Sequence, residues 1–229
     1  MDKICLVFDI DETILQYGPD HFSPDKFDYE ENLIGKDRIV IRPGLKKFIE
    51  FVKSNGEKTI LGIWTYGTQE YAEKVAKRIE QKYNNSEPLF KFVYSRENMS
   101  PWMLDNELDF IVDKHPELGI TKANTFLVDN RPANVIHRKN RNNGIIVESF
   151  NGDPGKKDAK MFEKLEAISK GLLTNGCIPN KYMTHFYVGG EKTPLASIGS
   201  KFDDGLTPVS VKKTRKQKKR GGNKRTRCV

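Results

Sequence analysis

The stretch Ile4-Cys5-Leu6-Val7-Phe8 runs directly into Asp9-Ile10-Asp11-Glu12-Thr13, and this junction decides the fold class. The first five residues are all apolar, which predicts a strand buried on both faces, as in a parallel sheet. The two aspartates then lie at the carboxyl end of a central strand, where open α/β sheets bind ligands. Two carboxylates one residue apart repel each other, which favours a use such as binding a cation or sharing the roles of nucleophile and acid/base. The alternative is a polar turn in which Thr13 caps a helix.

Strands and helices are expected to alternate through residues 1–173. Apolar runs predict strands, and apolar residues at helical spacing predict helices. The expected strands cover residues 58–64, 92–94, 124–128 and 144–148, and the expected helices follow Pro43-Gly44 and cover residues 68–83 and 159–173. This alternation predicts an α/β fold with a doubly wound parallel sheet flanked by helices.

Three stretches interrupt the alternation. Residues 16–41 are expected to form a flap or a small hairpin insert beside the aspartates, and residues 100–113 are expected to pack as a helix. Neither is long enough for a large cap domain. Residues 174–211 contain Gly189-Gly190 and several prolines, so they are expected to form an irregular linker or a loose wrap on the core.

Length and composition limit the class of protein. A chain of 229 residues can hold one sizeable core. It has no apolar run of about 18 residues, so we expect no membrane-spanning segment. The chain enters a strand directly after Met1-Asp2-Lys3, so we expect no signal peptide. Three scattered cysteines and four histidines without metal-ligand spacing predict an intracellular protein of a reducing compartment, with no disulfide framework or zinc site.

Positive charge is concentrated at the C-terminus. Residues 212–227 hold ten lysines and arginines and no acidic residue, so the net charge of +8 for the chain leaves −2 for the remainder. We expect residues 212–229 to be a disordered tail when free. The tail predicts salt-sensitive contact with nucleic acid or another polyanion, or an import address for the nucleus. The alternative is a solubilising tail without a partner. Such basic, glycine-containing ends are also similar to those of some proteins of large DNA viruses, which would indicate a viral origin.

Four motifs resemble those of the haloacid-dehalogenase superfamily of aspartate-nucleophile phosphatases, and in particular the small phosphatases of the RNA polymerase II C-terminal domain. They occur in the family's order, and the likeness covers roughly residues 3–172, with Ser95-Arg96-Glu97 as a weaker piece. The motifs are Phe8-Asp9-Ile10-Asp11-Glu12-Thr13-Ile14-Leu15, Arg42-Pro43-Gly44, Ile63-Trp64-Thr65-Tyr66-Gly67 and Phe126-Leu127-Val128-Asp129-Asn130-Arg131-Pro132.

The resemblance implies a phosphatase that works through an aspartyl-phosphate intermediate. Asp9 would be the nucleophile, and Asp11 would protonate the leaving oxygen and then deprotonate the attacking water. Mg²⁺ would be the cofactor, held by Asp9, the backbone carbonyl of Asp11, and Asn130 or Asp129. Because superfamily caps enclose small substrates, a chain without a large cap is expected to have an open site suited to a phosphate on a large molecule.

The resemblance also implies residues that bind the substrate phosphate. Thr65 and a lysine would bind its non-bridging oxygens, where transition-state charge gathers. Lys114 is nearest the family's spacing, and Lys122 is the competitor. The alternative for Lys114 is a solvated lysine ahead of a turn. Thr13 and Arg42 are further expected substrate-binding residues.

Three classes of function remain open at this stage. The leading one is a Mg²⁺-dependent protein serine/threonine phosphatase that acts on a phosphoprotein. The second is a phosphatase for nucleic-acid ends or nucleotides that holds the polymer with its basic tail. The third is a non-catalytic phosphatase-like domain that binds through the tail. The presence of Asp9, Asp11, Thr65 and Asp129 argues against the third class.

Overall fold

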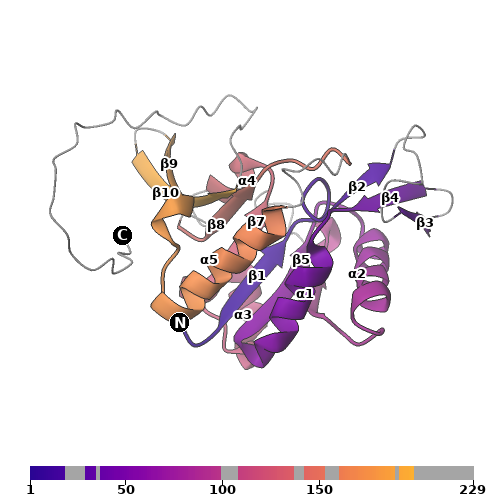
Figure 1. Ribbon diagram of the computed structural model, residues 1–229, viewed down its shortest axis with the longest axis horizontal. Helices are drawn as coiled ribbons and strands as arrows, with labels where there is room; N and C mark the ends of the chain where they lie inside the picture. Colours follow the sequence, from indigo (N-terminus) through magenta and orange to yellow (C-terminus); the bar gives the residue numbers. More distant parts are fainter. Residues whose placement is uncertain are drawn as a thin grey trace, which may run out of the picture.

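A seven-stranded sheet forms the centre of the molecule (Figure 1). This computed structural model describes residues 1–18, 29–34, 37–98, 108–136, 142–152, 160–188 and 191–198. The strands lie in the order β6-β5-β1-β7-β8-β10-β9. Their bounds are β1 Ile4–Phe8, β5 Thr59–Trp64, β6 Phe90–Tyr94, β7 Thr125–Asp129, β8 Gly144–Val147, β9 Met183–Val188 and β10 Glu191–Ile198. All neighbouring pairs are parallel except β9 with β10, so the predicted parallel sheet is confirmed.

Strand β1 is central and buried on both faces, as its sequence predicts. Leu6 and Phe8 belong to the larger core cluster on one face of the sheet, whereas Cys5 and Val7 belong to the cluster on the other face. Both neighbours of β1 are parallel to it, and Phe8 pairs with Ile63 of β5 and with Val128 of β7. The carboxyl ends of these three strands therefore meet at one edge.

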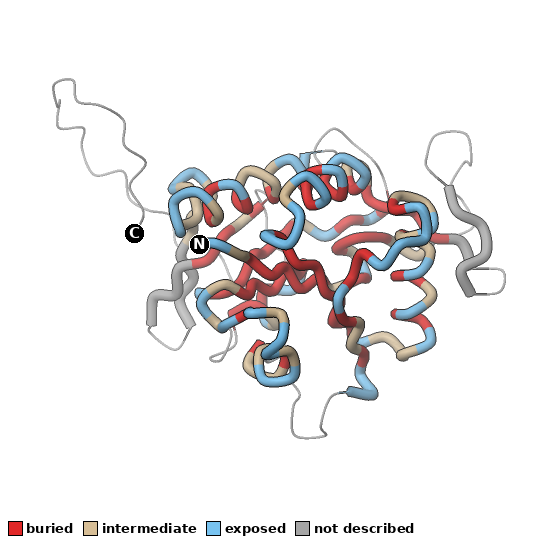
Figure 2. Tube along the Cα trace, turned by 90° about the horizontal axis from the view of Figure 1, so that it is seen from below, coloured by how far each residue is buried: buried red, intermediate tan, exposed pale blue. Residues whose placement is uncertain are grey.

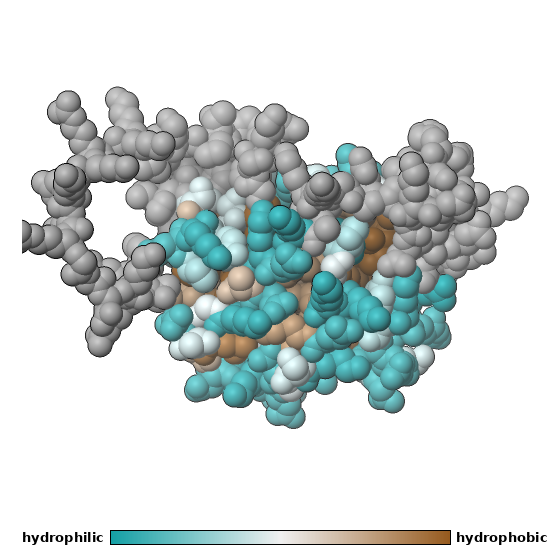
Figure 3. Space-filling view, viewed as in Figure 1, coloured by the Kyte–Doolittle hydropathy of each residue, from teal (hydrophilic) through white to brown (hydrophobic). Residues whose placement is uncertain are grey.

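Helices cover both faces of the sheet. Helices α1 (Leu45–Ser54), α2 (Gln69–Tyr83) and α5 (Met161–Asn175) pack on the face of Phe8, and α3 (Leu108–Lys114) packs on the other face. Helix α4 (Pro132–Ile136) directly follows β7. Burial is greatest along the central strands and the inner sides of the helices (Figure 2). The outer surface over α1 and α5 is mostly hydrophilic (Figure 3).

Residues 15–41 form the small insert that the sequence predicts, as far as the structure describes them. Strands β2 (Leu15–Gly18), β4 (Asp37–Ile41) and β3 (Tyr29–Ile34) make an antiparallel sheet in that order. This sheet lies beside α2 (Figure 1), where the rings of Tyr17 and Tyr71 are 5.7 Å apart. Of the helix expected over residues 100–113, the structure describes only the part in α3.

The expectation that residues 174–211 are irregular is wrong for β9 and β10. Ala196, Ser197 and Ile198 of β10 pair in parallel with β8, and β9 pairs with β10 in a hairpin. Leu195, Ala196 and Ile198 are buried, so the core extends beyond the expected boundary at residue 173. Pro194 and Gly189-Gly190 argued against strands, but Pro194 pairs only with β9 at the sheet margin. The expected basic tail lies outside the described residues.

Among the described residues, no helix is both long and apolar enough to cross a membrane. Cys5 lies in β1 as a buried free thiol.

Candidate active site

Three of the expected site residues come together at one edge of the sheet. Asp9 follows β1, Thr65 follows β5, and Asp129 ends β7. Because β5 and β7 flank β1, their carboxyl ends place all three residues side by side. The backbone N–H of Asp9 donates to the carbonyl of Val128 at 3.0 Å, which fixes the first residue after β1 against β7.

A tight turn after Asp9 shapes the edge further. The carbonyl of Ile10 accepts from the backbone N–H groups of Thr13, Ile14 and Leu15 at 2.9–3.2 Å. Glu12 has a φ of 59°, in the left-handed region that non-glycine residues seldom adopt. The turn reverses the chain within a few residues, so Asp9 and Asp11 both reach the same pocket.

The pocket at this edge has a volume of about 410 Å³. The expected residues Asp9, Asp11 and Thr65 are brought together there. The other described lining residues were not expected from the sequence, and they are Glu12, Tyr66, Gly67, Arg131 and Asn134. Arg131 belongs to the motif that begins at Phe126, and its positive charge two residues after Asp129 was the signal that could have identified it. We find no sequence signal for Asn134.

The carboxylate of Asp9 is in an environment that disfavours its charge. Burial raises its pKa well above the usual range, and the charges of Asp129 and Asp11 raise it further. Burial also raises the pKa of Asp129, although its Oδ1 accepts from the backbone N–H of Arg131 at 2.6 Å and its Oδ2 accepts from Asn134 Nδ2 at 2.7 Å. Two neighbouring acids with raised pKa values form a centre that needs positive charge.

Asp11 stands in a different environment, which sets it apart from Asp9. Its side chain is exposed on one side and accepts a 2.7 Å hydrogen bond at Oδ1 from the hydroxyl of Tyr71. Neighbouring protein raises the pKa of Asp11 by displacing water, and the hydrogen bond from Tyr71 opposes this shift. Tyr71 itself is buried, and the burial and the nearby carboxylate raise the pKa of its phenol. Tyr71 is therefore held as a neutral donor that orients Asp11.

Thr65 and Gly67 form a compact turn that also lines the pocket. The backbone N–H of Gly67 donates to Thr65 Oγ1 at 3.1 Å. A Cβ at Gly67 would lie 2.5 Å from Cδ1 of Tyr71, so glycine is required for this close approach. The Ser95-Arg96-Glu97 piece supports the same turn, because Arg96 N donates to the carbonyl of Gly67 and Glu97 accepts from the N–H of Gln69 at the start of α2.

Thr13 and Asn130 lie behind the pocket. Thr13 is fully buried, and its Oγ1 donates to Asn130 Oδ1 at 3.3 Å and accepts from Asn130 N at 3.2 Å. Asn130 Nδ2 donates to Glu12 Oε2 at 3.0 Å and to Ser149 Oγ at 2.9 Å. Thr13 therefore joins the turn to the end of β7 and does not line the pocket, and its expected contact with substrate stays a prediction.

Arg42 is a structural residue. Its side chain is 1% exposed. Its Nη1 donates to the carbonyl of Thr13 at 3.1 Å, and its Nη2 donates to the carbonyl of Glu148 at 2.7 Å. Its donors are directed at backbone carbonyls of the turn and of the segment after β8, and it does not line the pocket, so its expected contact with substrate stays a prediction.

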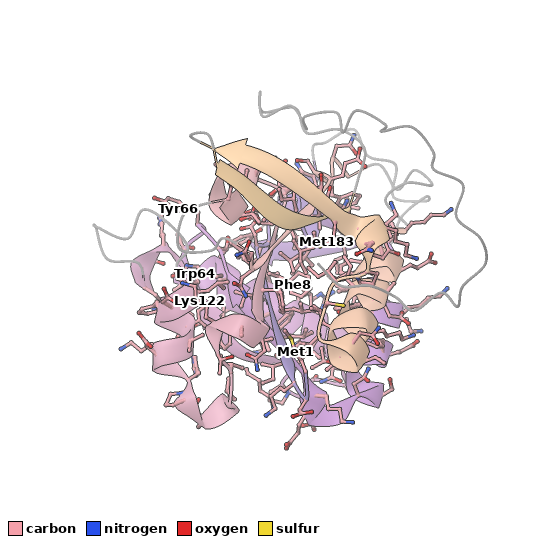
Figure 4. The ribbon with its side chains drawn as sticks, turned by 90° about the vertical axis from the view of Figure 1, so that its left-hand side faces the viewer. Met1, Phe8, Trp64, Tyr66, Lys122 and Met183 are labelled. Carbon is pink, nitrogen blue, oxygen red and sulfur yellow. The ribbon has the colours of Figure 1, made fainter. Side chains whose placement is uncertain are left out.

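The structure brings neither candidate lysine to the pocket. Lys114 ends α3, where its Nζ lies 5.8 Å from the centroid of the Phe110 ring. Lys122 precedes β7, at the opposite end of that strand from Asp129, and its Nζ donates to Asp109 Oδ2 at 2.8 Å. Figure 4 shows Lys122 apart from Tyr66, which is 59% exposed and lines the pocket.

The residues present suit a hard cation. Mg²⁺ uses one or two protein carboxylates and completes its coordination with other oxygens and water. Asp9 and Asp129 offer two carboxylates at the ends of neighbouring strands. Within the part of the chain that the structure describes, no group of three His, Cys, Asp or Glu side chains is arranged to hold a metal ion. A site there would thus rely on carbonyl, amide or water oxygens as well.

Comparison with protein-family models matches residues 4–175 to the family described as NLI interacting factor-like phosphatase. The chain belongs to this family. The expected resemblance is therefore confirmed, and the match covers the sheet from β1 to β8 and the helices up to α5. A search of the curated proteins found no match.

Solved structures give more distant likenesses. One is a fission yeast RNA polymerase II CTD phosphatase, Fcp1, in a variant bound to beryllium fluoride, with 20% identity and a TM-score of 0.47 over 75% of this chain and 51% of that one. Another Fcp1 structure, described as an essential RNA polymerase II CTD phosphatase, has 19% identity and a TM-score of 0.44 over 75% and 49%. An uncharacterized protein from Listeria monocytogenes serotype 4b has 21% identity and a TM-score of 0.35 over 56% and 67%. The chain spans about half the length of the two Fcp1 chains.

Proposed function

We propose that the chain hydrolyses phosphate monoesters through an aspartyl-phosphate, as a Mg²⁺-dependent protein serine/threonine phosphatase. The observation that carries this proposal is the pairing of Asp9 and Asp11 in one pocket with different surroundings. Asp9 lies against Asp129 at the end of the central strand, whereas Asp11 is exposed and held by Tyr71. Two acids with different environments suit the two roles of nucleophile and acid/base.

In the first half-reaction, a carboxylate oxygen of Asp9 forms a bond to phosphorus while the bond from phosphorus to the leaving oxygen breaks. The proton of Asp11 passes to the leaving oxygen, so the substrate departs as an alcohol. Tyr71 keeps the carboxyl group of Asp11 in one orientation through the 2.7 Å hydrogen bond. Thr65 lines the same pocket and would bind a phosphate oxygen.

In the second half-reaction, a water oxygen attacks the same phosphorus and passes a proton to Asp11. The bond between phosphorus and Asp9 breaks, which releases inorganic phosphate and restores the carboxylate of Asp9. Asp9, Asp129 and the backbone carbonyl of Asp11 are our candidates to hold Mg²⁺, with Asn130 as the further candidate expected from the resemblance. The bound cation supplies positive charge that reduces repulsion between the carboxylate and the phosphate.

The proposed substrate is a phosphoserine or phosphothreonine on a protein. The described insert between β1 and α1 is a small sheet of three strands, which leaves the pocket accessible to a phosphate carried by a large molecule. Family membership supports the same class of substrate.

A panel assay tests the proposal. Wild type and Asp9→Asn are assayed with phosphoserine and phosphothreonine peptides and with oligonucleotides phosphorylated at the 3′ or the 5′ end, each with Mg²⁺ and with EDTA. We expect Mg²⁺-dependent release of phosphate from the peptides, and a loss of at least about 1,000-fold in Asp9→Asn because the nucleophile is gone. Activity that persists in Asp9→Asn or in EDTA would contradict the mechanism.

The basic residues 212–227 favour a second candidate, a phosphatase for nucleic-acid ends or nucleotides. Ten positive charges without an acid are suited to a phosphate backbone, and their contribution to binding should decline with salt. Deleting residues 212–229 distinguishes the candidates. A protein phosphatase keeps its rate on short neutral phosphopeptides, whereas an enzyme for nucleic-acid ends loses kcat/KM on long strands more than on short ones. A domain that only binds polyanions through the tail would show no turnover in any arm.

A further inference from the structure

The pocket is strongly acidic for a site that would bind a phosphate monoester. Asp9, Asp11 and Glu12 all line it, and Asp129 lies directly behind Asp9. A phosphate monoester is itself anionic, and its transfer spreads charge over the non-bridging oxygens. The protein therefore needs a cationic side chain at the pocket in addition to any metal ion.

Arg131 is the only positively charged residue among those described that line the pocket. Its backbone N–H donates to Asp129 Oδ1, and the pocket that it lines also contains Asp9 and Asp11, so its positive charge lies beside these carboxylates. Lys114 and Lys122, by contrast, lie against Phe110 and Asp109 respectively. The position expected for a phosphate-binding lysine is thus left without a lysine among the described residues.

The backbone of Arg131 is fixed while its side chain is available. Its N–H donates to Asp129 Oδ1 at 2.6 Å, and the buried Pro132 begins α4 immediately afterwards. The side chain is exposed and makes no hydrogen bond or ion pair with the described residues. A fixed Cα at the mouth of the pocket with an unengaged guanidinium is the arrangement that a ligand-binding arginine requires.

We propose that Arg131 binds the non-bridging oxygens of the substrate phosphate, in the role expected for the motif lysine. This inference rests on the proposed function. A guanidinium presents two parallel N–H donors that match two phosphate oxygens, and it stays charged at every pH at which the enzyme works. Its contact strengthens as charge accumulates on those oxygens in the transition state.

The test compares Arg131→Ala and Arg131→Lys with two matched controls, Lys114→Ala and Lys122→Ala. The kcat/KM for an aryl phosphate and the dissociation constant for vanadate, a mimic of the pentacoordinate transition state, are measured for each protein. We expect Arg131→Ala to lower kcat/KM by about 100-fold and to weaken vanadate binding, since one oxyanion donor contributes on this scale. Arg131→Lys should recover part of the loss, and both controls should stay within about twofold of wild type.

Chemical rescue distinguishes contact from an indirect role. Millimolar guanidinium should restore turnover in Arg131→Ala, because a free cation can occupy the vacated position, but it should not affect the two lysine variants. A merely structural arginine would not be replaced in this way. Circular dichroism and thermal unfolding verify that Arg131→Ala is folded, as expected for an exposed side chain.

Two results would overturn the inference. One is an Arg131→Ala enzyme within threefold of wild type in both kcat/KM and vanadate affinity. The other is a loss in Lys114→Ala or Lys122→Ala as large as that in Arg131→Ala. If the proposed function itself is wrong, the result is different: the wild-type protein hydrolyses none of the phosphate esters. Vanadate and inorganic phosphate binding, measured by calorimetry, would then still decide whether Arg131 holds the anion.

Discussion

Arg42→Met should destabilise the protein without a specific effect on phosphate binding. The guanidinium joins the turn after Asp9 to the segment after β8 through the carbonyls of Thr13 and Glu148, at 3.1 and 2.7 Å. It also lies 5.5 Å from the centroid of the Phe150 ring. Methionine preserves much of the apolar stem but leaves both carbonyls without this donor.

The magnitude follows from the two strongest contacts. Hydrogen bonds from charged donors contribute about 1.5 kcal/mol or more each, so their loss should cost about 3 kcal/mol of the free energy of unfolding. Relief of the buried charge offsets part of this cost, although the partners left behind are carbonyls that still need donors. For a domain of this size, about 3 kcal/mol corresponds to a fall in Tm of roughly 6–12 °C.

Urea unfolding and vanadate titration of the folded variant provide the measurements, with Lys46→Met on the exposed side of α1 as the control. The control should change the free energy of unfolding by less than about 0.5 kcal/mol. Suppose instead that Arg42→Met unfolds like wild type while its affinity for vanadate falls tenfold or more. Arg42 would then contact the phosphate, and the assignment to a structural role would be refuted.

Three further predictions follow from the site and the sheet. Tyr71→Phe removes the hydrogen bond that lowers the pKa of Asp11, so the basic limb of the pH profile of kcat/KM for an alkyl phosphate, where Asp11 loses the proton that the leaving oxygen needs, should move to higher pH; an unchanged basic limb would contradict the coupling. Asp9→Asn should raise the Tm of the EDTA-treated protein at neutral pH, because the folded pKa of Asp9 lies above its unfolded value and its charge costs stability there. This gain should vanish on acidification below the unfolded pKa, where Asp9 is neutral in both states. Truncation after residue 175 should cost about 4 kcal/mol, because it removes the buried side chains of Leu195 and Ile198 from the core, whereas truncation after residue 198 should leave urea unfolding unchanged.

The sequence correctly predicted the elements whose apolar pattern is typical of only one kind of secondary structure. A run apolar at all five positions identified β1 as buried on both faces, and the spacing of Ala72, Val75, Ala76 and Ile79 identified the inner face of α2. That Asp9, Thr65 and Asp129 share one site was expected from the family resemblance, and the neighbouring carboxyl ends of β1, β5 and β7 account for it. The strand and helix expectations, by contrast, required only periodicity, which acts locally along the chain.

The remaining features depend on contacts that no local pattern records. Pro194 argued against a strand because a proline lacks the ladder donor, yet β10 forms, because Pro194 lies outside its pairing with β8, which covers only Ala196 to Ile198. Arg42 was expected to bind substrate because it belongs to one of the motifs. The sequence does not show that its guanidinium donates to the backbone carbonyls of Thr13 and Glu148. The exposed position of Arg131 and the hydroxyl of Tyr71 beside Asp11 likewise depend on how α4 and α2 pack against the strand ends.

Strand β10 has a consequence for association between copies of the chain. Strand β8 is buried at every position, and its outer backbone groups pair with β10. A sheet that ended at β8 would present an apolar edge with free N–H and C=O groups, which is a template for pairing with another molecule. The hairpin places β9 at that margin instead and occupies the backbone of β8 within the same chain. The segment beyond the family match thus covers the apolar edge of β8 within the same chain and moves the free edge of the sheet to β9, independently of any part in catalysis.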